Sequence, residues 1–131
     1  MYDSILIIEN NPILRRELVS VLSRANFEIA AVSNYNEAVF KIATFKPDIA
    51  IIDEVLPDIN GMEACYKLHI NLGIPVVIVG ENYGDEVWKK VTEAYADCYL
   101  IKPISFLILI ARIKAILRRY KIVFNSRSQY E

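Results

Sequence analysis

The sequence predicts an α/β fold, a doubly wound, five-stranded parallel sheet with helices on both faces. Five short, solidly apolar runs alternate with longer amphipathic segments along the 131 residues. A strand that is apolar on both faces is typical of a parallel sheet covered by helices. Five strand–helix units in series, joined by right-handed crossovers, give a doubly wound sheet.

The first elements follow directly from the apolar pattern. The expected strands cover residues 5–8, 29–32, 49–52, 76–79 and, more weakly, 98–101. Asn11 is expected to cap the first helix and Pro12 to begin it. The apolar residues of that helix expected to face inward are Leu14, Leu18, Val21 and Leu22.

The next two helices have recognisable ends. Asn34, with Glu37 three residues later, resembles a capping box that opens the second helix, and this helix is expected to extend towards Phe45. The third helix is expected over residues 62–72. Gly73 follows at a C-cap position, where a left-handed backbone suits glycine.

The last two helices complete one domain. The fourth is expected over residues 85–95 and the fifth from residue 105 to about 121. The domain therefore covers residues 1–122. Residues 123–131 are expected to be a polar C-terminal tail or the start of a linker, frayed at its end.

The composition excludes several classes of protein. With 54% hydrophobic and 24% charged residues, the chain is not disordered. Its 15 basic and 16 acidic residues nearly cancel, which argues against nucleic-acid binding over its whole surface. Cys65 and Cys98 have no metal-ligand or redox spacing, which favours a reduced, cytoplasmic location. No apolar run is long enough to span a membrane.

Polar residues gather where the expected strands end. Ligands of doubly wound sheets bind outside the carboxyl ends of the strands, at the point where the strand order reverses. The residues expected at these ends are Glu9, Asn10, Asp53, Glu54, Gly80, Glu81 and Lys102. The predicted site is therefore acidic, with one lysine.

An acidic pocket with one lysine suits a particular chemistry. Neighbouring carboxylates repel one another unless a cation neutralises them, and Mg²⁺ prefers oxygen ligands with one or two carboxylates. An aspartate beside such a cation can act as a nucleophile on a phosphoryl group that a lysine helps to hold. The alternative is that Glu9, Asp53 and Lys102 are ordinary solvated charges in loops.

Three segments resemble the receiver domain of bacterial two-component response regulators. They are residues 5–12 (ILIIENNP), 52–63 (IDEVLPDINGME) and 99–103 (YLIKP). The spacing Asp-x-x-x-Pro-x-x-x-Gly that starts at Asp53, followed by Lys-Pro after the fifth strand, makes the resemblance specific. It extends from residue 4 to about 120 and implies the flavodoxin-like (βα)5 fold with strand order 2-1-3-4-5.

The resemblance implies roles for individual residues. Asp53 would accept a phosphoryl group from the phosphohistidine of a histidine kinase or phosphotransfer protein, and Lys102 would contact a phosphoryl oxygen. The Lys102–Pro103 peptide bond would be cis. The ligands of the required Mg²⁺ would be Glu9, Asn10, Asp53 and the backbone carbonyl of Val55. Such a domain is not an enzyme in the usual sense, although it can catalyse its own phosphorylation and dephosphorylation.

Departures from the family pattern concern the metal site and the loop after the fourth strand. Asn10 replaces an acid, so we expect weaker Mg²⁺ binding. Gly80 replaces a serine or threonine whose hydroxyl would bind the phosphoryl group. Glu81 could then place a carboxylate near the same position, which would disfavour phosphorylation.

Two tyrosines also bear on the conformational switch. Tyr95 replaces a glycine, and a left-handed tyrosine costs about 1 kcal/mol, so a different end of the fourth helix is expected. Tyr99 occupies the place of the family's switch aromatic. Because its partner hydroxyl is missing, a half-buried strand residue with a solvated hydroxyl is an equally good interpretation.

Two hypotheses about function therefore remain. In the first, the domain is a working phosphoacceptor in a phosphorelay, with slow or metal-poor kinetics. In the second, it is an atypical pseudo-receiver that acts as a phosphorylation-independent protein-interaction module. The first is preferred because Asp53 and Lys102 are both present.

One surface is expected to mediate protein association. The fifth helix resembles that of regulators with winged-helix output domains, which dimerise through the fourth helix, fifth strand and fifth helix. The candidate interface residues are Trp88, Tyr95, Asp97, Ile108, Arg112 and Arg119. Trp88 and Ile108 stand where that group has an ionic pair, which suggests that an apolar contact replaced it. With Tyr95 they would form an exposed patch that binds a partner, for example a second copy in a homodimer. The alternative is that these are scattered surface hydrophobic residues without a function. The basic residues late in the chain are interpreted as a solvated helix face, without direct nucleic-acid binding.

Overall fold

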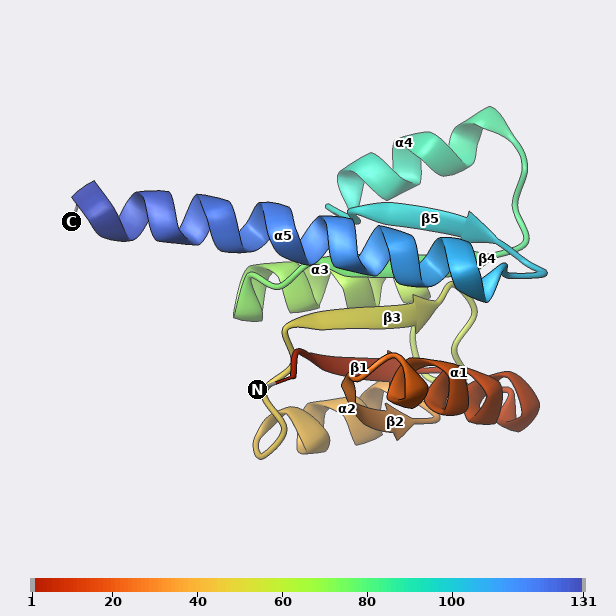
Figure 1. Cartoon of the computed structure of the whole chain (residues 1–131). Coiled ribbons are helices and arrows are strands. Elements are labelled where there is room, and N and C mark those ends of the chain that lie inside the picture. The colour runs from red at the N-terminus through yellow and green to blue at the C-terminus, as the bar shows by residue number, and fades with distance from the viewer. Residues whose placement is uncertain (1, 131) are drawn as a thin grey trace.

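The computed structural model describes residues 2–130 of the chain, and the side chains of residues 2–123. Five parallel strands form one sheet in the order β2-β1-β3-β4-β5, as predicted (Figure 1). The strands are β1 (Ser4–Ile8), β2 (Glu28–Val32), β3 (Ile49–Asp53), β4 (Val76–Gly80) and β5 (Cys98–Ile101). The helices are α1 (Pro12–Arg24), α2 (Tyr35–Ile42), α3 (Gly61–Leu72), α4 (Asp85–Glu93) and α5 (Phe106–Tyr130).

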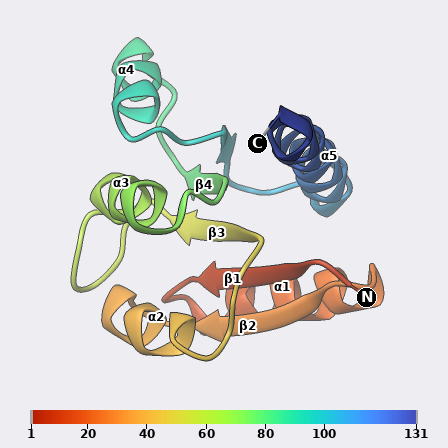
Figure 2. The same cartoon turned by 90° about the vertical axis from the view of Figure 1, so that its left-hand side faces the viewer.

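Two hydrophobic cores lie on opposite faces of the sheet. α1 and α5 cover one face, and α2, α3 and α4 cover the other (Figure 2). Alternate residues of a strand face opposite ways, so Leu6 of β1 packs in the same cluster as Leu68 of α3. The next residue, Ile7, packs with Leu18 of α1 and Leu109 of α5. This double burial explains why the strands are apolar at nearly every position.

The N-terminal caps of α1 and α2 follow the expected chemistry. The side chain of Asn11 accepts hydrogen bonds from the backbone N–H groups of Ile13 and Leu14, at 2.9 and 3.2 Å. The side chain of Asn34 accepts one from the N–H of Glu37 at 2.8 Å. In return, the Glu37 carboxylate accepts from the side-chain amide of Asn34 at 3.0 Å.

The helices end partly as predicted. Gly73 has φ 65° after α3 and so takes the expected left-handed cap. α2 ends at Ile42, before Phe45. The prediction of a different end for α4 was wrong, because Tyr95 takes the left-handed conformation itself, with φ 59°. Its ring stacks on His69 of α3, with centroids 4.6 Å apart, which helps to offset the backbone cost.

α5 is longer than expected. It continues through Tyr130, whereas the sequence suggested an end near Lys121, so the expected tail is helical as far as it is described. The segment 121–130 contains neither glycine nor proline, so nothing in it stops the helix. Glu131 lies outside the described residues, and the division at residue 122 stays a prediction. Among the helices described, none combines the length and apolar character needed to cross a bilayer.

Candidate functional site

The carboxyl ends of β1, β3, β4 and β5 border one pocket of about 750 Å³. The predicted site residues that line it are Glu9, Asn10, Asp53, Val55, Gly80 and Lys102. Glu54 and Glu81 line it as well. The pocket thus unites residues that are far apart in sequence, as strand-end reasoning predicted.

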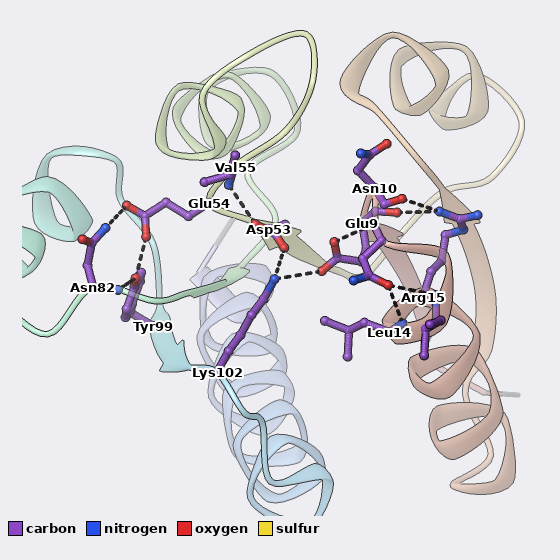
Figure 3. A network of polar contacts seen from close by, with 12 residues as sticks. Glu9, Asn10, Leu14, Arg15, Asp53, Glu54, Val55, Asn82, Tyr99 and Lys102 are labelled. Carbon is purple, nitrogen blue, oxygen red and sulfur yellow. Dashed lines mark hydrogen bonds and ion pairs between the residues drawn. The ribbon is translucent and has the colours of Figure 1, made fainter.

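Lys102 forms the charged centre of this pocket (Figure 3). Its ammonium group contacts the Asp53 carboxylate directly and lies 3.7 Å from Oε1 of Glu9. Burial alone would lower the pKa of Lys102, but the hydrogen bond to Asp53 and the charge of Glu9 raise it. The lysine is therefore firmly protonated, and the Lys102–Pro103 peptide bond is cis, as expected.

Glu9 is a buried carboxylate that is only half satisfied. Its Oε2 accepts a hydrogen bond from the N–H of Asn11 at 3.1 Å. Its Oε1 is buried and has no hydrogen-bond donor among the described residues. Burial, followed by the contact with Asp53, raises the pKa of Glu9 to about 7. A cation bound beside Glu9 and Asp53 would offset both the burial of the Glu9 charge and its repulsion by Asp53.

The oxygen ligands present at this edge fit Mg²⁺. Asp53 is 5% exposed and Glu9 is 2% exposed, and two carboxylates are the usual protein contribution to a magnesium site. The exposed amide of Asn10 lines the same pocket and so does Val55, whose backbone carbonyl completes the predicted set. Asn10 carries no charge, so this set is one charge weaker than one with a third acid.

The loop between β1 and α1 is fixed by a residue that the sequence analysis did not single out. Nη1 of Arg15 donates hydrogen bonds to the backbone carbonyls of Glu9 and Asn10, at 2.8 and 3.2 Å (Figure 3). An arginine six residues after a strand-end acid gave no recognisable pattern, because its partners are backbone atoms. Arg15 thereby holds the backbone that carries two of the predicted ligands.

Close packing explains why glycine stands at position 61, the last residue of the spacing that starts at Asp53. A Cβ atom at this position would lie 2.3 Å from the carbonyl oxygen of Asp53 and 2.6 Å from Cα of Glu54. The N–H of Gly61 also donates to the carbonyl of Glu54 at 2.9 Å. Only a residue without a side chain allows α3 to begin this close to the end of β3.

The hydroxyl of Tyr99 is buried and hydrogen-bonded, so the interpretation of a solvated hydroxyl was wrong. The residue is 6% exposed, and its hydroxyl donates to Oε1 of Glu54 at 2.5 Å. The same hydroxyl accepts from the backbone N–H of Asn82 at 3.1 Å, and the Asn82 amide donates to Oε2 of Glu54 at 2.7 Å. Burial and the bond to Glu54 raise the pKa of Tyr99 to about 12.

Glu54 and Asn82 are thus structural partners that the sequence analysis missed. Glu54 was identified only as one more acid at a strand end. A second acid directly after Asp53 was nonetheless a usable pattern, because strand residues alternate in direction and the two carboxylates must point apart. Gly80 makes the arrangement possible, since a Cβ there would lie 2.3 Å from both Glu54 Oε1 and the Tyr99 hydroxyl.

The candidate interface residues lie on different parts of the α4–β5–α5 surface. Trp88 and Ile108 are 51% and 52% exposed. Tyr95 packs on α3 through His69. Asp97, the expected acidic partner, instead accepts intramolecular hydrogen bonds from the N–H of Val76 and the hydroxyl of Tyr120.

The remaining predicted interface residues are Arg112 and Arg119, which are exposed along α5. The structure therefore leaves both guanidinium groups accessible at this surface. Their role in association stays a prediction.

Comparison with known proteins identifies what the chain is similar to. The family model described as response regulator receiver domain matches residues 5–114. The DNA-binding response regulator MtrA of Mycolicibacterium smegmatis is 30% identical over 119 residues, which are 91% of this chain and 52% of MtrA. The sensory transduction protein BceR of Halalkalibacterium halodurans is 30% identical over 115 residues, 88% of this chain and 50% of BceR. The chain thus spans about half the length of these relatives.

Solved structures give the same result. A two-component response regulator from Clostridium difficile has a TM-score of 0.85 and 31% identity, covering 90% of this chain and 98% of that chain. The BeF3-activated N-terminal receiver domain of Klebsiella pneumoniae RstA has a TM-score of 0.82 and 25% identity, covering 88% and 99%.

Proposed function

This chain belongs to the response regulator receiver domain family, and we propose that it accepts a phosphoryl group on Asp53 in a phosphorelay. The donor is the phosphohistidine of a histidine kinase or phosphotransfer protein. The observation that carries the proposal is the buried, unpartnered oxygen of Glu9 beside the Asp53–Lys102 ion pair. Such a pocket could take a cation at Glu9 and offers Asp53 as a nucleophile.

The proposed reaction follows from the positions of these groups. A carboxylate oxygen of Asp53 forms a bond to phosphorus, while the bond from phosphorus to the imidazole nitrogen breaks and its electron pair stays on the imidazole. Lys102 pairs with a phosphoryl oxygen as negative charge accumulates. Glu9, Asn10, Asp53 and the carbonyl of Val55 would hold Mg²⁺. When bound, the ion would neutralise the charge of the phosphoryl oxygens and of the acidic ligands.

Hydrolysis of the acyl phosphate would make the domain catalyse its own dephosphorylation. A water molecule attacks phosphorus, and the Asp53 carboxylate leaves with the electron pair. Gly80 offers no hydroxyl to hold the phosphoryl group, so we expect this group to be held by Lys102 and the metal. We place the domain in the cytoplasm, where Mg²⁺, phosphohistidine donors and reduced cysteines occur together.

The test is phosphorylation by a small acyl-phosphate donor with Mg²⁺, followed by intact mass. The expected result is the gain of one phosphoryl group in the wild type and none in Asp53→Asn. Asp58→Asn is the matched control, because Asp58 lies in the same loop but its carboxylate caps α2 through the N–H groups of Tyr35 and Asn36. Absence of a mass gain under saturating donor would exclude the phosphoacceptor function.

In that event the second candidate, a phosphorylation-independent interaction module, would hold. It is favoured by the loss of a polar side chain at position 80 and of an acid at position 10. Both substitutions remove groups that only a phosphorylated, metal-bound domain needs.

A homodimer through α4, β5 and α5 is a further part of the proposal. Trp88 and Ile108 supply exposed apolar area on this face. Trp88→Lys should lower the association constant measured by sedimentation, whereas Phe40→Lys on α2, at an 82% exposed position, should not. Equal association of wild type and Trp88→Lys would exclude this interface.

A further inference from the structure

A closed hydrogen-bond network lies beside the Asp53 pocket. It consists of Glu54, Asn82 and Tyr99 (Figure 3), and we call it the Glu54 network. Glu54 and Tyr99 both lie close to Gly80. These residues belong to the end of β3, the loop between β4 and α4, and β5. The network therefore ties together the segments on which any movement near Asp53 would have to act.

Every polar group at the centre of the network has a partner. Oε1 of Glu54 accepts from the Tyr99 hydroxyl, and Oε2 accepts from the Asn82 amide. The Tyr99 hydroxyl in turn accepts from the backbone N–H of Asn82. Glu54 and Tyr99 are both buried, so moving Tyr99 outward would leave a buried carboxylate oxygen without a donor.

The network lies to one side of the Asp53–Lys102 pair, although Glu54 and Asn82 line the same pocket. The Asp53 carboxylate points towards Lys102, whereas the side chain of the next residue, Glu54, points towards Tyr99 (Figure 3). Gly80, which lines the same pocket, has no side chain with which to contact a group on Asp53. A phosphoryl group on Asp53 therefore finds no side chain on Gly80, the last residue of β4, through which to pull Tyr99.

The network also has a path to the surface. The ring of Trp88 on α4 meets the ring of Tyr99 edge to face, with centroids 6.0 Å apart. Trp88 is 51% exposed, and it is the single tryptophan of the chain. The position of Tyr99 thus sets the packing beneath an exposed part of α4.

We propose that the Glu54 network is a fixed brace that holds Tyr99 inward, and the α4 surface around Trp88 in one conformation, whether or not Asp53 is phosphorylated. The brace goes beyond the proposed function, because it concerns what the rest of the molecule does when Asp53 reacts. Chemistry at Asp53 and the shape of the α4 surface are then independent. A partner that binds this surface meets the same surface in both states.

Trp88 fluorescence tests the proposal, with loading measured separately. The wild-type protein is loaded with beryllofluoride and Mg²⁺, and occupancy of Asp53 is followed by fluorine NMR. The expected result is full occupancy with unchanged Trp88 emission and acrylamide quenching. A shift of Trp88 emission that tracks occupancy would overturn the brace, whereas a failure to load would count against the proposed function only.

Three variants test the brace in the unloaded protein. Tyr99→Phe removes one hydroxyl, Glu54→Leu removes both acceptors, and Gly80→Ala places a Cβ 2.3 Å from two network oxygens. Each should increase the quenching constant of Trp88 about twofold or more, the change expected when a buried edge contact is lost. Unchanged quenching in Tyr99→Phe and Glu54→Leu would overturn the brace, even if Gly80→Ala fails to fold.

Matched controls lie in the same loop. Gly84→Ala repeats the glycine substitution where nothing lies within 4 Å of the added Cβ. Tyr83→Phe repeats the hydroxyl removal at a position that is 74% exposed. Both controls should leave Trp88 quenching and Asp53 loading at wild-type values, so a change in either would contradict the assignment to the Glu54 network.

Discussion

Asp53 and Glu54 are neighbours in sequence but belong to two regions with opposite electrostatic properties. On the Asp53 side, two buried carboxylates share one lysine, and Oε1 of Glu9 has no donor among the described residues. On the Glu54 side, both carboxylate oxygens are hydrogen-bonded. The first region thus contains a buried oxygen without a hydrogen-bond donor, whereas both oxygens of the Glu54 carboxylate in the second region have one.

A binding site and a structural network can therefore be distinguished even when both are acidic and both line one pocket. Burial does not separate them, since Glu9, Asp53 and Glu54 are all at most 8% exposed. Hydrogen bonding of the polar atoms does separate them, because a buried oxygen without a hydrogen-bond partner is destabilising unless a ligand binds it. Four substitutions test the contrast, in order of decreasing expected effect.

Gly61→Ala should displace both regions together, because it acts on the backbone that carries Asp53 and Glu54. The added Cβ would meet backbone atoms of Asp53 and Glu54 at 2.3 and 2.6 Å, so the end of β3 must move. We expect a loss of more than about 3 kcal/mol in the free energy of unfolding, since backbone cannot give way as a side chain can. Urea unfolding measures this, with Gly84→Ala as the control. A loss below 1 kcal/mol in Gly61→Ala, about the scale of a surface change, would contradict the close packing.

Glu9→Gln should act on the first region only, and its effect should depend on pH. The folded protein raises the pKa of Glu9 from 4.5 to about 7, so this group favours folding below pH 4.5 and loses that contribution as pH rises through 7. Without Mg²⁺, wild type should lose about 2–3 kcal/mol relative to Glu9→Gln between pH 5 and pH 8. Urea unfolding across that range measures the difference.

Mg²⁺ supplies the control for this prediction. The ion should stabilise the wild type more at pH 8, where Glu9 is ionised, than at pH 5, and should stabilise Glu9→Gln little at either pH. Glu63→Gln, at an exposed position on α3, should show neither effect. A wild-type curve parallel to that of Glu9→Gln would show that Glu9 titrates normally.

Asn82→Ala should act on the second region only. It removes a 2.7 Å hydrogen bond to the Glu54 carboxylate, for which we expect a loss of about 1–2 kcal/mol in unfolding free energy. The rate of Asp53 phosphorylation should change less than about twofold, because Asn82 is hydrogen-bonded to Glu54 and Tyr99 rather than to Asp53 or Lys102. A large loss of phosphorylation in Asn82→Ala would show that the two regions are functionally coupled.

Arg15→Met should have the smallest effect. It removes hydrogen bonds to the carbonyls of Glu9 and Asn10 but keeps most of the aliphatic stem. We expect Mg²⁺ affinity, measured by titration calorimetry, to fall about twofold to fivefold, the equivalent of one modest hydrogen bond. Arg16→Met, at the next and exposed position, should bind Mg²⁺ like the wild type.

The fold and the pocket could be predicted because both depend on local or periodic features. Double-sided burial makes a parallel strand apolar, and the strand ends of a doubly wound sheet meet at one edge. The sequence therefore predicts that Glu9, Asp53 and Lys102 lie together, and all three line one pocket. Asn11 and Gly73 likewise act within a few residues of their own positions.

The features that sequence reasoning missed depend on contacts between distant segments. The hydroxyl of Tyr99 is satisfied by Glu54, 45 residues earlier in the chain. Tyr95 keeps a left-handed backbone beside a ring on another helix, so its local cost did not decide the outcome. In each case a tertiary contact decided the conformation, and the residues on either side in the sequence do not indicate such a contact.

The clearance at Gly80 also restricts the order in which this sequence can change over evolutionary time. A serine or threonine introduced at position 80 would collide with Glu54 and Tyr99 for as long as both remain. Such a residue could be accepted only if the Glu54 or Tyr99 side chain shifted or was itself replaced. The effect of a substitution at any one of the three positions should therefore depend on which residues occupy the other two.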